Sequence, residues 1–489
     1  MSKLVSSIAA LALLSGPALS LTAEELWDDW QTLTTNMGGE LSAASQDYAD
    51  GTLTLEGVTL SFDIAGAAGD TDYGTIAFVE QSDGAVAVEL PAEMTVTTTS
   101  TVDGQTVTQT GRVEHEGMSI VARGAAEART YDIAADRFAY VFDDMTGGAA
   151  DTPIGVTLTF DDLTSTYRAG EGGDPDGFAQ ALDAARMSLA VVEPGETGGA
   201  LDYALTSLTG TIAGSYPSQP PAEGATGLAA MGVTYDGTIS HSGSTLKVAG
   251  TGETGPFQIE GSSDAGTLGL GLQETGIRYD IGSTGAELSI QAAAFPLPIA
   301  LSMAEARTAL TFPMGPVGTR SPYALQTEYR DLAIDDALWA LFDPTGQLPR
   351  DPATLVIRME GEAEVVADIF GDPQAAAELA GPPMIPRSLR LTELLLDVVG
   401  ARLEGSGDLT FPAEAGPVPQ PVGTLNLRLE GAFQLLDKLV ALGFIPAEQA
   451  AFARGMAGAV ARPVGEDALE SEIVFTEGGG ITANGLPLQ

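Results

Sequence analysis

The sequence predicts a mainly β protein: a long antiparallel, curved sheet or a sandwich, with a capping N-terminal helix and a few short helices near the C-terminus. Apolar and polar residues alternate with period two through most of the chain, as they do in strands with one buried face. Glycines punctuate these segments at short spacing, which is typical of antiparallel strands joined by tight turns. The three- and four-residue apolar spacing of helices is confined to a few places.

The N-terminus has the three parts of an export signal. Lys3 supplies a basic residue, Leu4–Leu14 a short apolar core, and Ala18-Leu19-Ser20 a small-x-small cleavage site. A membrane-spanning helix needs about 20 apolar residues, and this core is shorter. No cysteine is available for lipid modification. We therefore expect residues 1–20 to be a signal peptide cut between Ser20 and Leu21, which leaves a periplasmic or secreted protein with no transmembrane anchor.

The chain is strongly acidic, with a formal net charge of −46 and no lysine or arginine from Leu21 to Gly111. A polyanion is repelled by phosphate backbones and anionic lipid head groups, so nucleic-acid binding and electrostatic membrane docking are not expected. Absence of cysteine excludes disulfides, thiol nucleophiles and cysteine-ligated metals. The two histidines, His115 and His241, are too few for a multi-histidine metal site and lie in separate strand-like segments. The sequence predicts no cofactor and no metal.

Leu21–Gly39 is predicted to be a well-capped helix. Thr22 and Glu25 fit a capping box, Leu21 and Leu26 fit a hydrophobic staple, and two glycines end the helix. Its polar face is acidic rather than basic, which favours a helix that plugs one end of a sheet over a membrane-surface helix.

Strands follow along the chain. The alternating segments are Leu53–Ile64, Ile76–Leu90, Met94–Val113, Met118–Val121, Arg137–Phe142 and Gly155–Tyr167, and the third should turn at Asp103-Gly104. Asp174-Pro175 is predicted to begin a helix that carries Phe178, Leu182 and Met187.

A Pro- and Gly-rich segment at residues 214–227 has no apolar period, which predicts a linker. It would separate an N-terminal β-rich domain, residues 21–213, from a C-terminal β-rich domain, residues 228–489. A further short Ala-rich helix is expected from Asp372-Pro373.

Two strand–helix units are predicted in the second half. Leu310-Thr311-Phe312-Pro313 precedes a strand, a helix around Leu338–Phe342 and another strand; Leu409-Thr410-Phe411-Pro412 precedes the same order of elements. Two explanations stay open. A four-residue identity is short enough to arise by chance, whereas the shared order of elements favours duplication of one unit.

The C-terminal unit, Thr424–Gln489, should contain a strand, two helices separated by Gly443 and Pro446, and closing strands Ala468–Phe475 and Ile481–Leu488. The two helices should turn four apolar residues toward a common interior at the end of the sheet. These candidate core or groove-lining residues are Leu436, Leu439, Phe452 and Met456.

Three motifs fail their structural context. Gly250–Gly255 matches G-x-G-x-x-G, but Pro256 and a strand follow where a nucleotide site needs a helix. Gly172–Asp183 has partial calcium-loop spacing without the first ligand or the final glutamate. No G-x-S-x-G elbow and no phosphate-binding loop is present.

The C-terminal segment, with AFQLLDKLVALGFIPAEQAAFARGMA and ITANGLPLQ, resembles an uncharacterised family of exported alphaproteobacterial proteins, domain of unknown function 2125. The ELWDDW helix and the segment YRDLAIDDALWALFDPTGQLP are similar to that family as well. The resemblance is strong over Tyr323–Gln489 and thin between Gly66 and Gly315, and it supplies no catalytic residues. The strand pattern is in turn similar to AsmA-type envelope proteins, whose curved groove is thought to hold acyl chains.

Three hypotheses of function follow. The first is a ligand-free structural or interaction module of the cell envelope, which binds an envelope protein through its sheet edges or terminal helices. The second is binding of an apolar ligand or lipid in a curved β-groove, suggested by a positive mean hydropathy beside extreme acidity. The third, a carboxylate-based hydrolase, is the remotest because nothing singles out a pair of carboxylates, and we expect no enzyme activity.

Overall fold

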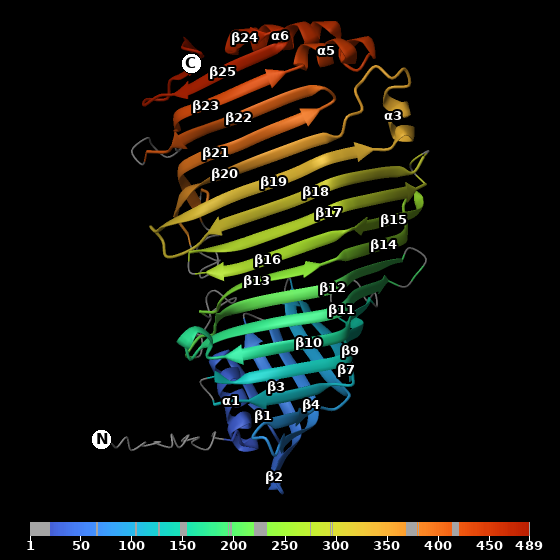
Figure 1. Cartoon of the computed structure of the whole chain (residues 1–489), viewed down its shortest axis with the longest axis vertical. Coiled ribbons are helices and arrows are strands. Elements are labelled where there is room, and N and C mark those ends of the chain that lie inside the picture. The colour runs from blue at the N-terminus through green and yellow to red at the C-terminus, as the bar shows by residue number, and fades with distance from the viewer. Residues whose placement is uncertain are drawn as a thin grey trace, which may run out of the picture.

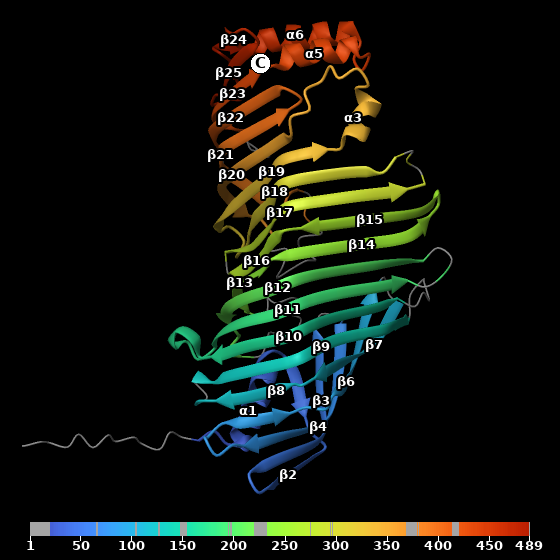
Figure 2. The same cartoon turned by 45° about the vertical axis from the view of Figure 1, so that its right-hand side comes forward.

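A computed structural model shows one antiparallel sheet that extends along the whole molecule. It describes residues 20–64, 67–102, 105–125, 128–146, 154–193, 195, 198–219, 232–273, 275–293, 295, 297–367, 379, 381–412 and 420–488. From β10 to β23 the strands lie across the long axis, one after another, whereas the blue strands of the N-terminal region run steeply behind their neighbours (Figures 1 and 2). Helices α5 and α6 lie at one end of the molecule and helix α1 lies near the other. The predicted fold class, a mainly β protein with a long antiparallel sheet, is confirmed.

The first half of the sheet contains twelve strands. They are β1 (Gly39–Ser42), β2 (Ser45–Ala49), β3 (Thr52–Ile64), β4 (Ala67–Glu80), β5 (Val86–Glu89), β6 (Glu93–Val102), β7 (Gln105–Glu116), β8 (Ser119–Arg123), β9 (Thr130–Thr146), β10 (Gly155–Ala169), β11 (Gly177–Glu193) and β12 (Gly199–Ser215). The predicted hairpin of β6 and β7 is present up to the pair Val102 and Gln105. Its turn, Asp103-Gly104, lies outside the described residues.

The second half continues the same sheet. Its strands are β13 (Thr234–His241), β14 (Gly243–Gly252), β15 (Gly255–Ser263), β16 (Ala265–Gln273), β17 (Gly276–Ala292), β18 (Ile299–Pro313), β19 (Arg320–Ile334), β20 (Ala353–Val365), β21 (Met384–Val398), β22 (Ala401–Thr410), β23 (Val422–Glu430), β24 (Arg462–Gly465), β25 (Ala468–Phe475), β26 (Ile481–Ala483) and β27 (Leu486–Pro487).

The sheet passes the predicted linker without interruption. Strand β12 pairs with β13 through Thr209–Ser215 and with β14 through Gly199–Thr206. Both partner strands follow the linker in the sequence. Backbone pairing therefore joins the regions on either side of the linker, residues 21–213 and 228–489, into one sheet. Residues 220–231 of the linker region lie outside the described residues.

The sheet forks and rejoins twice in the same way. One half of β4 pairs with β5 and the other half with β6, and the branches rejoin on β9 through β8 and β7. Strand β12 forks to β13 and β14, and the branches rejoin on β17 through β16 and β15. Each fork therefore places two pairs of short strands side by side, of which one pair is a hairpin, β6 with β7 and β14 with β15.

Helix α1 (Ala23–Asn36) closes one end of the sheet, as its sequence predicts. The capping box of Thr22 and Glu25 is formed, and Leu21 and Leu26 are buried together. The helix packs against β3 and β4, where Trp30 contacts the ring of Phe78 edge-on at 5.2 Å between ring centroids. An ion pair between Asp29 and the buried Arg129 ties the helix to the start of β9.

The predicted helix after Asp174-Pro175 is wrong. That segment is β11, which is paired along its length with β10 on one side and β12 on the other. Its alanines favour a helix, but backbone hydrogen bonds to two neighbouring strands override that preference. The Asp174 carboxylate accepts from the Asp176 N–H and the Ser215 hydroxyl, both at 3.1 Å, so it holds a turn rather than capping a helix. A short 3₁₀ turn, Glu171–Gly173, precedes it.

The strand–helix units of the second half are confirmed. Helix α3 (Asp336–Phe342) follows β19, and helices α5 (Ala432–Ala441) and α6 (Ala447–Val460) follow β23. In both units the strands on either side of the helices pair with each other, β19 with β20 and β23 with β25. The Asp372-Pro373 helix prediction falls outside the described residues.

A candidate apolar groove on one face of the sheet

One face of the sheet carries mostly apolar residues along its length. Cross-strand partners connect Leu53 to Ser471 in a single row, which we call the apolar row. Its members, in order, are Leu53, Phe78, Val88, Ile120, Ile133, Ser165, Leu182, Gly210, Ile239, Leu268, Ile281, Thr308, Thr327, Ile357, Leu394, Gly405, Leu427 and Ser471. Directly paired side chains lie on the same face of a sheet, so this row traces one continuous surface.

Burial changes along the apolar row. Leu53 and Phe78 are 3% and 0% exposed beneath α1, whereas Ile239 and Ile281 are 40% and 44% exposed in the middle of the sheet. Helix α1 covers one end of the face, and the middle has no comparable cover among the described residues. Large apolar side chains stand exposed there, which is uncommon for a surface that stays in water.

A line of backbone interruptions crosses the sheet. Several long strands have a residue with positive φ near the middle, where one or two residues are left unpaired and pairing resumes in the same register, namely Asp162 in β10, Ser207 in β12, Gly285 in β17 and Asp331 in β19. The interruption shifts the alternation of side chains, so that Leu205 and Leu208, on either side of Ser207, line the same face. Because the interruptions fall beside one another on successive strands, they form one continuous crease across the sheet.

The apolar side of the crease is hollow. The hollow has a volume of about 750 Å³ and is lined by 24 residues of strands β10 to β18, of which fourteen are apolar. We call it the central groove. Typical lining residues are Phe160, Leu182, Tyr203, Leu205, Leu246 and Leu288. Small-molecule sites commonly measure 300–1,000 Å³ and are mostly apolar, so this groove has the size and chemistry of a ligand site.

The apolar face continues beyond the groove toward α5 and α6. A second cross-strand row runs from Tyr279 through Leu310, Leu325, Met359, Leu391, Gly407 and Leu425 to Ile473. Leu310 is 41% exposed, so the open surface extends past the groove. The groove is thus one part of a longer apolar track.

Comparison with known families places most of this face in a recognised segment. Residues 243–488, half of the chain, match the family described as an uncharacterized protein conserved in bacteria (DUF2125). The chain belongs to the DUF2125 family. The matched segment begins at the start of β14 and therefore includes part of the groove and the whole track beyond it. We found no match for the chain among curated proteins or among solved structures.

The four candidate residues of the two C-terminal helices do not share an interior in this DUF2125 chain. Leu436 and Leu439 of α5 are half-buried, but Phe452 and Met456 of α6 are 71% and 52% exposed. Helix α6 is rich in alanine and glycine, and Ala450 is its one buried residue. Because Ala450 is the buried residue of α6, the larger side chains of Phe452 and Met456 point toward solvent. At the predicted cleavage site, Ser20 is exposed and Leu21 is buried.

The groove residues were not singled out from the sequence. Their segments alternate apolar and polar residues as strands do, for example around Leu246 in β14 and Leu288 in β17. Alternation alone shows that one face is apolar, but it does not show whether another layer covers that face. The sequence signal for an open face is the lack of a second set of strands or helices long enough to cover that face.

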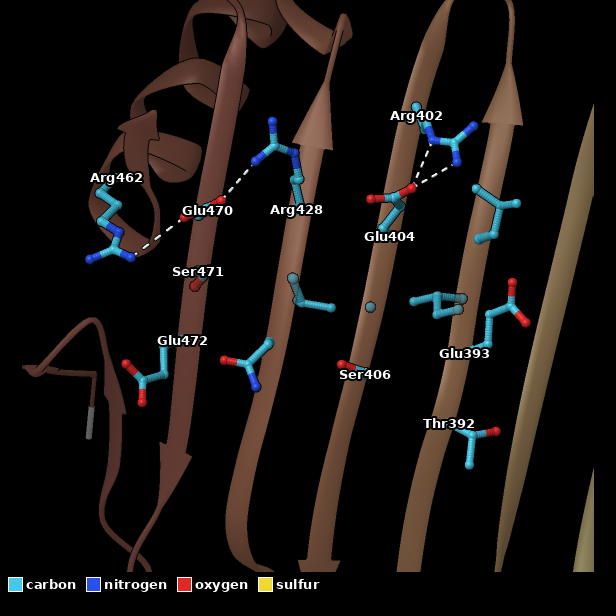
Figure 3. Close-up of a pocket in the computed structure, with 15 residues that line it drawn as sticks. Thr392, Glu393, Arg402, Glu404, Ser406, Arg428, Arg462, Glu470, Ser471 and Glu472 are labelled. Carbon is cyan, nitrogen blue, oxygen red and sulfur yellow. Dashed lines mark hydrogen bonds and ion pairs between the residues drawn. The ribbon is translucent and has the colours of Figure 1, made fainter. Parts of the chain in front are cut away.

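The opposite face of the sheet in this DUF2125 chain carries charged residues in paired rows. Figure 3 shows its hollow near the C-terminus, where Arg428 lies 2.8 Å from Glu470 and Arg402 lies 2.7 Å from Glu404. Hydrogen bonds with carboxylates raise the pKa of both arginines, chiefly the bond with Glu404 for Arg402 and the bond with Glu430 for Arg428. Because the guanidinium groups in this hollow already face carboxylates, it offers no uncompensated positive charge for an anion.

Among the described residues, no group of three or more histidines, aspartates or glutamates is placed to hold a metal ion. None of the helices in the described ranges is long and apolar enough to span a membrane. The G-x-G-x-x-G match at Gly250–Gly255 forms the turn between β14 and β15, in which Gly252 pairs with Gly255. A strand, not a helix, follows this turn, so no helix N-terminus lies at these glycines.

Proposed function

We propose that this DUF2125 protein binds the apolar chains of a lipid or a similar amphiphile in the central groove. The observation that carries the proposal is a hollow of about 750 Å³ on a mostly apolar face that no described helix covers in the middle of the sheet. Removing apolar surface from water stabilises a complex by roughly 25 cal/mol per Å². The similarity of the strand pattern to AsmA-type envelope proteins supports the same class of ligand, although by analogy of fold alone.

Titration of the delipidated protein with the uncharged fluorophore N-phenylnaphthylamine tests the proposal. We expect saturable fluorescence enhancement and a lower affinity, by about tenfold, in Ile281→Asp, because a carboxylate would then have to be buried beside the probe. Gln291→Asp adds the same charge to the same strand outside the lining of the groove, and its affinity should be unchanged. Absence of saturable binding, or equal losses in both variants, would overturn the proposal.

The natural ligand should accompany the protein during purification. Mass spectrometry of organic extracts from protein isolated from its native envelope should detect a lipid or other apolar compound at near-stoichiometric amounts. Its yield should fall in Ile281→Asp and persist in Gln291→Asp. Clean extracts from protein whose groove still binds the fluorophore would restrict the proposal to a transient ligand.

A second candidate function is docking of an envelope protein on α6. It is favoured by the exposure of Phe452 and Met456, one helical turn apart at the far end of the molecule (Figure 2). A photo-crosslinking residue at position 452 should capture a discrete partner in cells. The same residue at Tyr48, which is 48% exposed on β2 at the opposite end, is the control. Identical crosslinking patterns from both positions would count against a specific site on α6.

Export places these functions in the periplasm or outside the cell, and this location is part of the proposal. It is supported by the basic, apolar and small-x-small parts of residues 1–20. N-terminal sequencing of the protein from a native source should begin at Leu21, and retention of Met1 would contradict it. The proposal assigns no catalytic step to the chain.

A further inference from the structure

A small polar cluster interrupts the apolar lining of the central groove. His241, Ser244, Ser263 and Ser283 all line the groove. The cross-strand register joins His241 to Gly266 and Gly266 to Ser283, and it pairs Ser244 with Ser263. We call these four residues the polar centre. They lie at the crease, where β13 ends and β14 begins. At this point the two branches of the sheet between β12 and β17 lie next to each other.

The imidazole of His241 lies over a glycine. A Cβ atom at Gly266 would be 2.3 Å from His241 Nε2, so the ring occupies the space that any other residue would fill. His241 Nδ1 is buried and has no hydrogen-bond partner. Burial lowers the pKa of His241, which keeps the ring neutral at pH 7, with one nitrogen as a donor and the other as an acceptor. The ring lines the groove, so a polar ligand group that reaches a ring nitrogen can form a hydrogen bond with it.

The serine pair adds further hydrogen-bonding capacity. The hydroxyl oxygens of Ser244 and Ser263 are 2.6 Å apart, and one hydroxyl donates to the other. That bond uses one of the two hydroxyl hydrogens and leaves the second for a ligand. The polar centre thus offers both donors and acceptors without a formal charge.

The charge around the polar centre limits which head groups fit. Within the described lining of the groove there is no lysine or arginine. The one charged lining residue is Glu287, which lies between Ala286 and Leu288 and so alternates toward the other face. The chain as a whole carries a net charge of −46. A phosphate or carboxylate in the groove would therefore lose its water without gaining a counter-charge, which is strongly unfavourable.

We propose that the polar centre binds the uncharged polar end of an amphiphile, a hydroxyl or ester group, while the attached hydrocarbon chain lies along the apolar row. This inference rests on the proposed function of the groove and adds the class of head group. It predicts discrimination against anionic amphiphiles that carry the same chain.

Competition against N-phenylnaphthylamine separates head-group preference from chain binding. Octadecene, oleyl alcohol and oleate are matched in chain length and differ in the terminal group. Wild-type protein should bind oleyl alcohol about fivefold more tightly than octadecene, the effect of one net hydrogen bond, and oleate more weakly than the alcohol. If none of the three displaces the fluorophore, the proposed function itself fails. If oleate binds as tightly as the alcohol or more tightly, chain binding stands and the inference about the head group is overturned.

His241→Phe identifies the residue that carries the preference. Phenylalanine keeps a flat ring over Gly266 and removes both ring nitrogens, so octadecene should bind as in wild type while the advantage of oleyl alcohol disappears. His115→Phe makes the same change at the other histidine, which is not a lining residue of the groove, and should keep the advantage. An advantage that survives in His241→Phe would exclude His241 from the site, and Ser263→Ala then tests the serine pair. Retention in both variants would overturn the assignment of the polar centre.

Discussion

Two phenylalanines at opposite ends of the sheet lie in opposite environments. Phe78 is 0% exposed between α1 and the sheet, whereas Phe452 on α6 is 71% exposed. Phe78→Ala should cost about 3 to 5 kcal/mol, because it empties a buried aromatic site. Phe452→Ala should change stability by less than about 0.5 kcal/mol, as at other exposed positions. Urea denaturation of both variants measures this contrast, and a large loss in Phe452→Ala would mean that α6 is covered in solution.

Asp343, at the end of α3, gives a prediction about pH. Its buried carboxylate accepts the Leu348 N–H at 2.7 Å, and hydrogen bonds from the backbone of Gln347 and Leu348 lower its pKa below the ordinary 3.8. A lowered pKa stabilises the folded state above the unfolded-state pKa, and this contribution is lost as the pH falls through the folded-state pKa.

We therefore expect Asp343→Asn to be less stable than wild type at pH 7 and to lose less stability on acidification below the ordinary pKa of aspartate. Asp336→Asn in the same helix is the control, since the Asp336 side chain is 91% exposed and pairs only with Arg350 at 2.8 Å. Denaturation curves at neutral and acidic pH would show the difference. Parallel pH profiles for wild type and Asp343→Asn would contradict the assigned role of this carboxylate.

At the scale of elements, the crease depends on single residues with positive φ. Gly285 has φ +59°, and a Cβ there would lie 2.2 Å from Asp264 Oδ2, so Gly285→Ala should destabilise the fold by about 1 to 3 kcal/mol. Ser207 has φ 50° and pays the cost of a left-handed conformation already, so Ser207→Gly should be neutral or stabilising. Thermal denaturation compares the two. Equal losses of stability in the two variants would show that the left-handed backbone conformation does not decide which residue is favoured at these positions.

The crease also explains why the groove lies where it does. Strands β12 and β17 line the groove on both sides of their interruptions, with Leu205 and Leu208 in β12 and Ser283 and Ala286 in β17. The site is thus a property of several strands at the crease and not of any one segment.

At the scale of the whole molecule, repulsion among carboxylates opposes folding. The net charge of −46 far exceeds the local compensation of the arginine–carboxylate pairs, most of which are half exposed and individually weak. Raising the ionic strength from about 0.01 M to about 0.15 M shortens the Debye length from about 30 Å to about 8 Å. We expect the melting temperature to rise over this range, as measured by circular dichroism. A fall would mean that the paired rows outweigh the repulsion.

The sequence by itself determined the elements whose cause is local. Thr22 and Glu25 specify the start of α1 because the capping hydrogen bonds lie within one turn of the chain. The strand–helix order near α3, α5 and α6 follows from a change of apolar period that is visible in any short window. The alternation of the strands likewise fixed the mainly β class.

Only the tertiary structure decided what each apolar face meets. Phe178 belongs to a strand because β10 and β12 pair with its backbone, although its segment has a helical composition. Ile281 lines an open groove, Phe78 lies in a core and Phe452 faces solvent, although all three occupy apolar positions of ordinary patterns. Periodicity shows which side chains share a face, whereas cover depends on elements far away in the sequence, and no local pattern encodes that contact.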